Sequence, residues 1–399
     1  MEQLSRISSF SNWKNKAILF TLICLLFSPV LSGQEIGLKD LAVPNSPAFV
    51  LTDLTPSTVQ TPGTPKTFVL GIAQSFQSSA GGFPQNYSAE FAPYWWFRGD
   101  DRNIYALAGI KTMRNDSGKM IILPQENVFS GLKFTSISLA FLNKDLIPDT
   151  ISLSQKIFSF GFRTTFLKIH QKGYAESIKG KIDNWHLETQ KILKDINEEL
   201  ITAIRKKDSA KIAALLQQLL TAPKTTEIAK EINDLMSEKP VFEWDIAAAY
   251  AAYGVNDTVW KTGRYGVWTT LSSYLPLNLG GAKPNRNYLN LNVILRYMGD
   301  HYQKNDLGYL AKINNLDLGG KLALEFDLFS VGIESLYRYS NGLANTQNRT
   351  VGMINYKVAD NVYINGAFGK NFKSSDRLIV LFGINWGFGN ESVSLPQKK

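Results

Sequence analysis

Apolar and polar residues alternate along the stretch from Arg377 to Asn390. Every second residue from Leu378 to Phe388 is large and apolar, while the positions between them become small or polar toward Gly389. Successive side chains of a β-strand point to opposite faces of its sheet. The stretch therefore predicts a strand with one apolar face and one face of small and polar residues.

The same alternation recurs along the chain, and twelve strands are predicted. They cover residues 68–76, 87–97, 135–141, 158–166, 242–250, 265–277, 289–297, 316–326, 331–339, 350–358, 362–372 and 377–390. An even number of strands is typical of a closed antiparallel barrel, in which alternate residues meet lipid and a polar interior. A further hairpin within residues 98–127 would raise the number to fourteen.

The second predicted strand ends in aromatic residues. Pro93 lacks a backbone donor and indicates a bend or bulge. The run from Tyr94 to Phe97 is typical of the aromatic girdle that forms at a membrane interface. Beyond it, a short helix is expected from Asp101 to Met113.

Between the fourth and fifth strands, the apolar period changes to that of a helix. Three helices are predicted, over residues 174–208, 210–220 and 226–238. Ser209 is expected to cap the second helix, and Pro223 to break the chain before the third. Lys and Glu recur at every turn, so this insertion, residues 169–240, is not expected to lie in lipid.

The N-terminus has the features of a secretory signal. Basic residues (Arg6, Lys14 and Lys16) precede an apolar run, Ala17 to Leu31, that ends in small residues. Residues 1–33 are therefore expected to be removed. The only cysteine, Cys24, lies inside the apolar run with apolar neighbours, so neither a lipid anchor nor a disulfide is expected.

Residues 34–66 contain five prolines and predict an extended lead-in to the first strand. Two interpretations are open. The segment is either a periplasmic tether, or its apolar run from Ser46 to Leu51 docks into or under the barrel.

These patterns predict an all-β transmembrane barrel with a periplasmic α-helical insertion. The segments are a signal peptide (1–33), the lead-in (34–66), strands one to four (67–168), the insertion (169–240), strands five to twelve (241–390) and a tail (391–399). If the last strand ends in the periplasm, strand parity places the insertion there. Tight turns at 327–329 and 359–361 and a long outer loop at 299–314 are expected to match that orientation.

Composition narrows the class further. Aromatic residues make up 12% and charged residues 19% of the 399 residues, which excludes a disordered or charge-rich helical chain. The slightly negative mean hydropathy matches a barrel with a polar interior. Although the net charge is +9, no basic cluster with interleaved aromatics occurs, so nucleic-acid binding is not expected.

The sequence gives little sign of catalysis. His170, His186 and His301 have no metal-ligand spacing and are expected to be ordinary residues of a helix or loop. A membrane-embedded hydrolase would need a serine beside a histidine, and no predicted strand carries a histidine in mid-span. Neither a nucleophile elbow nor a phosphate-binding glycine loop occurs. An enzyme, a cofactor and a metal site are therefore not expected.

The remaining candidates are charged residues on the polar side of the strands, which are expected to line the lumen. They are Glu90, Arg163, Glu243, Asp245, Arg296, Asp317, Lys321, Glu325, Glu334 and Arg338. Two interpretations are open, because such charges either pair and fill a narrow interior or line a selective water-filled path.

With its terminal strand containing Trp386 and Phe388 and its lead-in around Ser46 to Phe49, the region 67–390 resembles outer-membrane β-barrel proteins of the Bacteroidota type, a porin-like and poorly characterised family. The resemblance implies residence in the lipid of the outer membrane of a Gram-negative cell, after insertion by the barrel-assembly machinery. The tail from Glu391 to Lys399 departs from the family pattern. No catalytic or ligand-binding residue carries over.

Two functions are expected from these features. The first is a porin-like channel for transport of small solutes. The second is a non-catalytic scaffold, or a component of an assembly or secretion complex, that binds a periplasmic protein through residues 171–239.

Overall fold

The computed structural model describes Ala48 and residues 87–96, 102–144, 155–254, 259–277, 287–305, 307–326, 328–341, 346–359, 362–370, 372 and 378–386. The chain forms two compact units. Residues 189–226 lie in the smaller unit, and all other described residues lie in the larger one. The signal peptide, most of the lead-in, the first predicted strand and the tail are outside the described residues.

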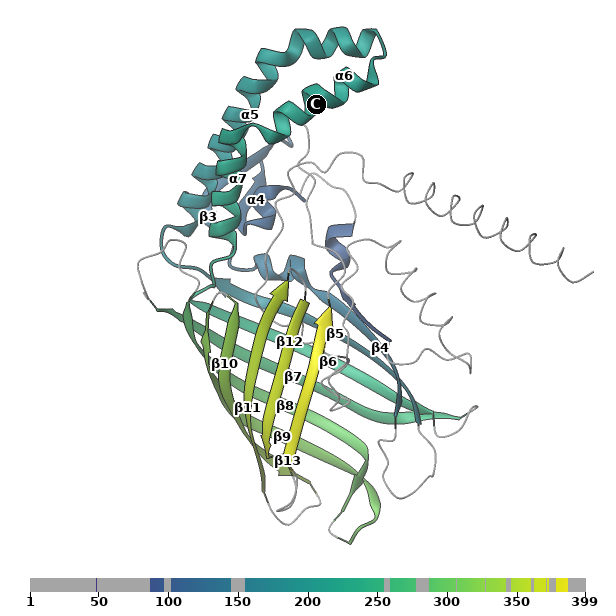
Figure 1. Ribbon diagram of the computed structural model, residues 1–399. Coiled ribbons are helices and arrows are strands. Elements are labelled where there is room, and N and C mark those ends of the chain that lie inside the picture. The colour runs from purple at the N-terminus through teal and green to yellow at the C-terminus, as the bar shows by residue number, and fades with distance from the viewer. Residues whose placement is uncertain are drawn as a thin grey trace, which may run out of the picture. The chain divides into compact units, whose positions relative to one another are not determined.

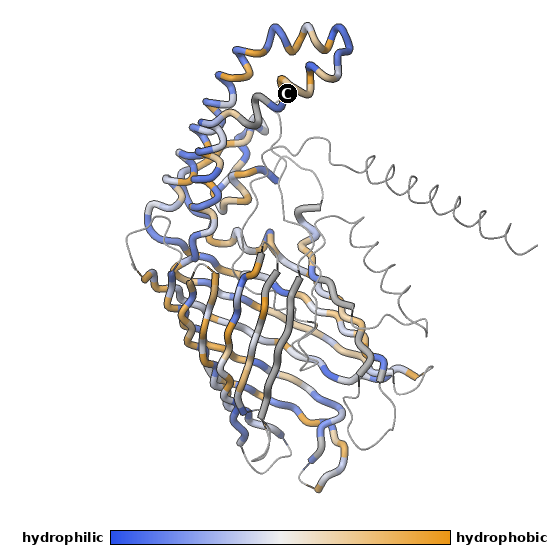
Figure 2. The backbone as a smooth tube through the Cα atoms, viewed as in Figure 1, coloured by the Kyte–Doolittle hydropathy of each residue, from blue (hydrophilic) through white to orange (hydrophobic). Residues whose placement is uncertain are grey.

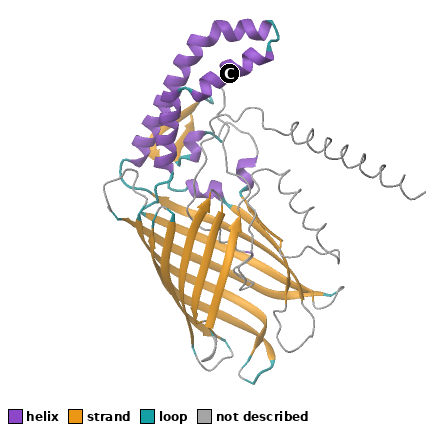
Figure 3. Ribbon diagram, viewed as in Figure 1, coloured by secondary structure: helices purple, strands orange, loops and turns teal. Residues whose placement is uncertain are grey.

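Eleven antiparallel strands form one sheet in the larger unit, in the order β1-β4-β5-β6-β7-β8-β9-β10-β11-β12-β13. Figure 3 shows these strands as long, tilted neighbours, and Figure 1 shows the sheet curving so that β10–β13 pass in front of β5–β8. The strands are β1 (Tyr87–Phe91), β4 (Ser136–Lys144), β5 (Gln155–Ile169), β6 (Phe242–Gly254), β7 (Trp260–Pro276), β8 (Tyr288–Lys304), β9 (Leu310–Glu325), β10 (Phe329–Ser340), β11 (Gln347–Ala359), β12 (Val362–Lys370) and β13 (Leu378–Trp386).

These eleven strands correspond one to one with the second to twelfth predicted strands, which confirms an antiparallel all-β sheet. The pairing of the described residues leaves β1 and β13 at the two ends of the order. The predicted strand over residues 68–76 lies outside the described residues, so no pairing is assigned to it.

The hairpin foreseen within residues 98–127 exists, but it does not extend the large sheet. Its strands, β2 (Ile110–Arg114) and β3 (Met120–Glu126), pair only with each other among the described strands. The helix predicted from Asp101 to Met113 is wrong in length, because α4 covers only Ile104–Leu107. Gly109, with a φ of 74°, follows α4 in the left-handed conformation that glycine favours, and the chain then continues as β2.

The segment around Pro93 also differs from expectation. Residues Pro93–Trp96 form the 3-10 helix η1 and do not continue strand β1. Proline cannot donate to a neighbouring strand, so β1 ends at Phe91. The aromatic-girdle role of Tyr94 to Phe97 therefore stays a prediction, made now for a helical turn.

The sheet has two chemically distinct faces. Cross-strand partners share a face, and the register aligns the apolar positions of every strand with those of its neighbours. Figure 2 shows the alternation as hydrophobic and hydrophilic residues that follow one another along the strands. The large side chains of the apolar face are exposed, among them Phe160, Tyr250, Val267, Leu271, Leu291, Val293, Leu295, Leu318, Leu322, Val331, Ile333, Tyr337, Ile354 and Phe368. We call this side the apolar face and the other side the polar face.

The helical insertion follows β5 and consists of α5 (Tyr174–Arg205), α6 (Ser209–Thr221) and α7 (Pro223–Met236). In the larger unit, α4, β2, β3, α5 as far as Glu188 and α7 from Glu227 make a small apolar core. Ile178, Ile182 and Ile232 are completely buried in it. We call this part the insertion base.

The two turns between the helices correct the predicted boundaries. Asp208, not Ser209, caps α6, because its Oδ1 accepts a hydrogen bond of 3.0 Å from the backbone N of Lys211. Pro223 begins α7 in place of breaking the chain before it, since proline fits the first turn of a helix, where no donor is needed. In the smaller unit, Ile196 and Leu215 are buried against each other.

Turn lengths do not distinguish the two ends of the sheet as expected. The predicted outer loop 299–314 is mostly strand, because β8 ends at Lys304 and β9 begins at Leu310. The turn between them is tight, with the Asn305 N donating to the Tyr309 O over 2.9 Å. The turns after β9 and β11 are short, as predicted. Within the described residues, none of the helices has both the length and the apolarity that crossing a bilayer requires.

Candidate functional site

The polar face of the sheet holds the charged residues predicted to be functional. By register, all ten lie on this face, because each faces another polar-face residue on the neighbouring strand. The structure joins several of them into three groups, on β1 and β5, on β5 and β6, and on β8 to β11.

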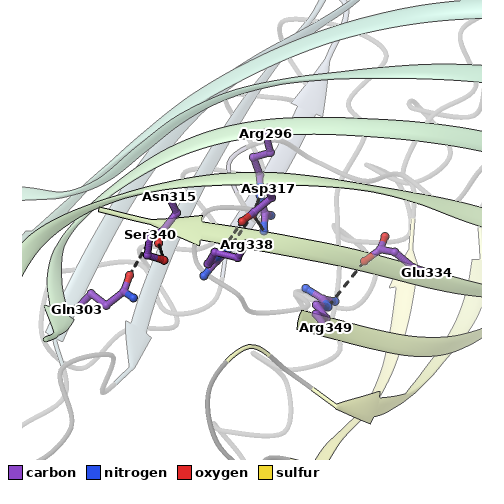
Figure 4. Close-up of polar contacts among 8 residues, drawn as sticks. All are labelled: Arg296, Gln303, Asn315, Asp317, Glu334, Arg338, Ser340 and Arg349. Atoms are coloured by element: carbon purple, nitrogen blue, oxygen red, sulfur yellow. Dashed lines mark hydrogen bonds and ion pairs between the residues drawn. The ribbon is translucent and has the colours of Figure 1, made fainter. Parts of the chain in front are cut away.

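The most buried group is an ion triad on β8, β9 and β10 (Figure 4). Asp317 accepts a hydrogen bond of 2.8 Å from Arg296 Nε on Oδ2 and one of 2.7 Å from Arg338 Nε on Oδ1, and the Arg296 Nη2 lies 2.6 Å from Oδ2 as an ion pair. The Arg338 Nη2 also donates to Oδ2 over 3.0 Å. The carboxylate is completely buried, so two guanidinium groups neutralise a charge that would be costly alone.

The register explains why these three residues meet. Asp317 stands directly opposite Arg296 on one side and Arg338 on the other, so three strands contribute one residue each at the same level. The aromatic ring of Phe372 stacks on Arg338 in a cation–π contact, with 3.7 Å between the ring centroid and the guanidinium carbon. The triad has two cations for one carboxylate and therefore carries an excess positive charge.

A second row of charges lies four residues away along β9 and β10. Lys321 stands opposite Glu334 in the register. Arg349 of β11 reaches toward the same carboxylate, with its Nε 3.7 Å from Glu334 Oε1, which is too long for a hydrogen bond (Figure 4). We call Lys321, Glu334 and Arg349 the second row.

At the β1 side of the sheet, Glu90 is buried and pairs with Arg163. The Arg163 Nη2 lies 3.1 Å from Glu90 Oε1, and the Ser136 hydroxyl donates to the same oxygen over 2.5 Å. This arrangement fixes a carboxylate that is almost fully removed from solvent.

The remaining predicted carboxylates bind neutral partners. The Thr165 hydroxyl lies 2.6 Å from Asp245 Oδ1 and 3.1 Å from Glu243 Oε1. Glu325 accepts a hydrogen bond of 2.6 Å from Asn290 Nδ2. These carboxylates therefore belong to hydrogen-bonded clusters on the polar face.

Several residues of this face were not predicted. Arg264 pairs with Asp300 at 2.9 Å, and a neutral row of Gln303, Asn315 and Ser340 lies beyond the triad (Figure 4). Extending the predicted strands by the same alternation would have found Arg264 and Asp300. Arg349 was missed because the alternation of its strand is irregular in the sequence.

The lead-in reaches the polar face at Ala48. Its backbone N donates to the Ser138 Oγ over 3.1 Å, and the residue is completely buried. It packs in an apolar cluster with Ala140, Ile157, Ala249, Ala251, Tyr253 and Met298. At this residue the lead-in docks on the sheet, while docking into or under a barrel stays a prediction and the rest of the run from Ser46 to Leu51 lies outside the described residues.

Some buried polar atoms of this face have no hydrogen-bond partner among the described residues. The side-chain oxygens of Asn290, Asn292 and Gln347 accept no hydrogen bond from the part of the chain that the structure describes. Asn290 and Asn292 lie on β8, and Gln347 stands opposite Arg338. Buried acceptors of this kind are normally satisfied by water.

The insertion base contains a second polar cluster, at its connection to the sheet. Glu126, the last residue of β3, accepts hydrogen bonds from the His170 backbone N at 3.1 Å and lies 2.6 Å from its Nδ1. The imidazole stacks on Tyr174, with 3.9 Å between ring centroids. Burial lowers the pKa of His170 below its ordinary value, although the hydrogen bond of its ring to the Glu126 carboxylate opposes the shift.

The structure also corrects the expected environment of one histidine. His170 lies in the loop after β5 and His186 on α5, as predicted. His301 was expected in a helix or loop but lies in β8, close to the end of that strand at Lys304. Its placement follows from the greater length of β8.

No group of three or more metal-ligating side chains gathers anywhere in the described ranges. The arrangement offers fixed charges and hydrogen-bonding groups on one face of the sheet. No family model matches the chain, and no curated protein or solved structure matches it either.

Proposed function

We propose that this chain is a transmembrane β-barrel of the bacterial outer membrane that carries small solutes along its polar face. The observation that carries the proposal is the reversed burial of the sheet. Asp317 is 0% exposed, whereas Leu318, the next residue of β9, is 56% exposed. An apolar surface that runs over eight neighbouring strands, β5 to β12, is far larger than a protein surrounded by water keeps, and lipid is the surrounding that suits it.

The order of side chains along the apolar face supports this surrounding. The middle of β9 is aliphatic, as in the exposed Leu318 and Leu322, although β5 has exposed aromatic side chains at Phe160 and Phe162. Aromatic residues also lie toward both ends of the strands. At the end next to the insertion, the ring centroids of Phe166 and Trp244 are 5.0 Å apart. At the opposite end, Tyr337 and Tyr339 are exposed. Aliphatic bands between two aromatic girdles are typical of membrane barrels.

Barrel closure belongs to the same proposal. Unpaired backbone groups are too costly in lipid, so β1 and β13 each need a neighbour. The strand expected over residues 68–76 would supply one between them and would make twelve. If the last strand ends in the periplasm, counting the antiparallel strands back assigns the insertion to the periplasmic side. This assignment depends on the strand count alone, because the turn lengths do not support it.

Hydrogen-bond acceptors on the polar face that the described residues leave unsatisfied support a hydrated path for solutes. Asn290, Asn292 and Gln347 each keep a buried oxygen without a partner among the described residues, which favours a hydrated interior over a dry, filled one. Ala48 lies on the same polar face, so the lead-in narrows the path at the point where Ala48 binds Ser138.

Single-channel recording in planar bilayers tests the proposal. The chain from residue 34 onward should give stepwise currents, and deletion of residues 34–66 should increase the conductance because Ala48 and its neighbours are removed. Replacement Ser138→Val, which removes the acceptor of the Ala48 N–H, should act in the same direction but more weakly. Ser335→Val, on the apolar face, is the matched control and should leave the conductance unchanged.

A lipid-only baseline is recorded with the same detergent. If neither the chain from residue 34 nor the deletion variant conducts above this baseline, the channel proposal fails. Conductance that is unaffected by the deletion would contradict only the narrowing by the lead-in.

A second function, a scaffold with a periplasmic protein partner, is favoured by one observation. Helix α5 leaves the large apolar side chains of Leu187, Ile201 and Ile204 exposed. Amphipathic helices use such side chains to bind partner proteins. Affinity capture with and without residues 171–239 tests this function, and an identical set of partners for both forms would count against it.

A further inference from the structure

The two rows of charge on β8–β11 differ in their access to solvent. In the triad, the side chains of Arg296, Asp317 and Arg338 are at most 9% exposed. In the second row, Glu334 is 17% and Arg349 is 21% exposed. The ion pairs of the triad are thus buried, whereas the side chains of the second row are partly exposed.

Positive charge exceeds negative charge in both rows. The triad has two arginines for Asp317, and the second row has Lys321 and Arg349 for Glu334. The positions directly opposite the second row are neutral, since Asn292 faces Lys321, Val351 faces Glu334 and Leu336 faces Arg349. The nearest carboxylate further along β9, Glu325, is already bound by Asn290.

Arg349 also has hydrogen-bonding capacity to spare. At 3.7 Å its Nε does not form a hydrogen bond with Glu334, and this buried nitrogen has no other partner within the described part of the chain. A guanidinium group is a planar fork that matches the two oxygens of a carboxylate or phosphate. Lys321 adds a point charge from the neighbouring strand pair.

We propose that the second row is an anion-binding point of the path, so that small oxyanions, with a carboxylate or phosphate group, pass in preference to cations. This inference depends on the proposed channel. Lys321 of β9 and Arg349 of β11 contact the anion, and Glu334 lies on β10, the strand between them. The excess charge of the buried triad, four residues away, adds a fixed positive potential without contacting the solute.

Reversal potentials in a potassium chloride gradient test the selectivity. The channel should prefer chloride, and Lys321→Gln with Arg349→Gln should shift the reversal potential toward zero. Lys312→Gln is the matched control, because Lys312 lies on the same strand but on the apolar face, against the Tyr265 ring. That variant should keep the original reversal potential.

Inorganic phosphate tests the binding itself. Added at constant potassium chloride, it should reduce the chloride current of the original chain and have less effect on the double variant. Arg349→Lys keeps the charge but removes the fork, so it should keep the chloride preference and lose part of the phosphate block. Far-UV circular dichroism confirms that each variant has folded.

The outcomes separate the two proposals. A conducting channel that prefers potassium, or whose selectivity ignores both substitutions, overturns the anion site and leaves the channel intact. Absence of conductance overturns the channel, and calorimetric titration of the detergent-solubilised protein with inorganic phosphate then decides the site. Equal heats for the original chain and the double variant would overturn it.

Discussion

The sheet and the insertion base bury opposite kinds of residue. In the base, Ile178, Ile182 and Ile232 are inside and the charged residues of the helices are largely outside. In the sheet, Asp317 and Asn315 are inside and Leu318 is outside. One chain thus contains two regions whose hydrophobic patterns have opposite meanings, which is understandable if water surrounds one region and lipid the other.

The difference also concerns what stabilises each region. The base has an ordinary apolar core, in which burial of large side chains is the main favourable contribution. The polar face of the sheet has ion pairs and hydrogen bonds instead, and each broken one leaves a buried polar group without its partner. Three substitutions test this contrast, and they are taken from the largest expected effect to the smallest.

The largest effect is expected from Asp317→Ala. The change leaves Arg296 and Arg338 close together and buried without their carboxylate. Loss of one partner from a buried ion group costs about 3–5 kcal/mol, measured as the free energy of unfolding in urea. Glu334→Ala is the matched control. Its ion pair is long and partly exposed, so about 1 kcal/mol or less is expected. Equal losses would contradict the assignment of the triad as the polar core.

Two leucines of nearly equal exposure separate the two surroundings. Leu318 in the middle of β9 is 56% exposed and Leu187 on α5 is 57% exposed. In phospholipid bilayers, Leu318→Arg should cost about 2–4 kcal/mol, because an arginine at the bilayer midplane is poorly solvated. Leu187→Arg should change the free energy of unfolding by only about 0.5 kcal/mol, as at an ordinary wet surface. The same small effect at both positions would remove the need for lipid around the sheet.

The smallest effect concerns the connection between the two regions. Burial lowers the pKa of His170 in the folded protein below the ordinary histidine value of about 6.5. As the pH falls below about 6.5, the unfolded chain therefore binds a proton at His170 more readily than the folded protein does. The insertion base should therefore have its full stability above that pH and lose stability as the pH falls below it. Lys168, Glu126 and Glu243 face the ring and modify the shift without reversing it.

Hydrogen exchange of residues 104–126 and 174–188 at several pH values measures this loss. His170→Gln should flatten the pH dependence of exchange in both segments. A slope that persists in this variant would assign the effect to another group.

The sequence predicted the elements well because their periods are long and regular. All eleven described strands of the sheet, and the three helices, follow from the spacing of apolar residues. The small hairpin of β2 and β3 was not placed, since its alternation is short and its partners, such as Ile178, are distant in sequence. The ten predicted charged residues could be assigned to one face of the sheet from the alternation of positions along each strand.

The partners of those charges could not be predicted. Asp317 meets Arg296 and Arg338 because three strands have one particular register, and a single sequence does not determine the register between strands. Ala48 was recognised only as part of an apolar run in a proline-rich segment. Its contact with Ser138 depends on where a distant strand lies.

The insertion has a consequence for how the sheet assembles. Nearly every pair of neighbouring strands is joined by a short connection, so the sheet can grow one hairpin after another. Two pairs are exceptions: β1 and β4, with residues 92–135 between them, and β5 and β6, with residues 170–241 between them. Helices α5 and α7 pack on each other through Ile178 and Ile232, and Lys181 pairs with Glu231 at 2.5 Å, so the two ends of this segment are brought together by its own fold. Early folding of the helices would shorten the effective loop, and it would lower the entropy lost when β6 joins β5.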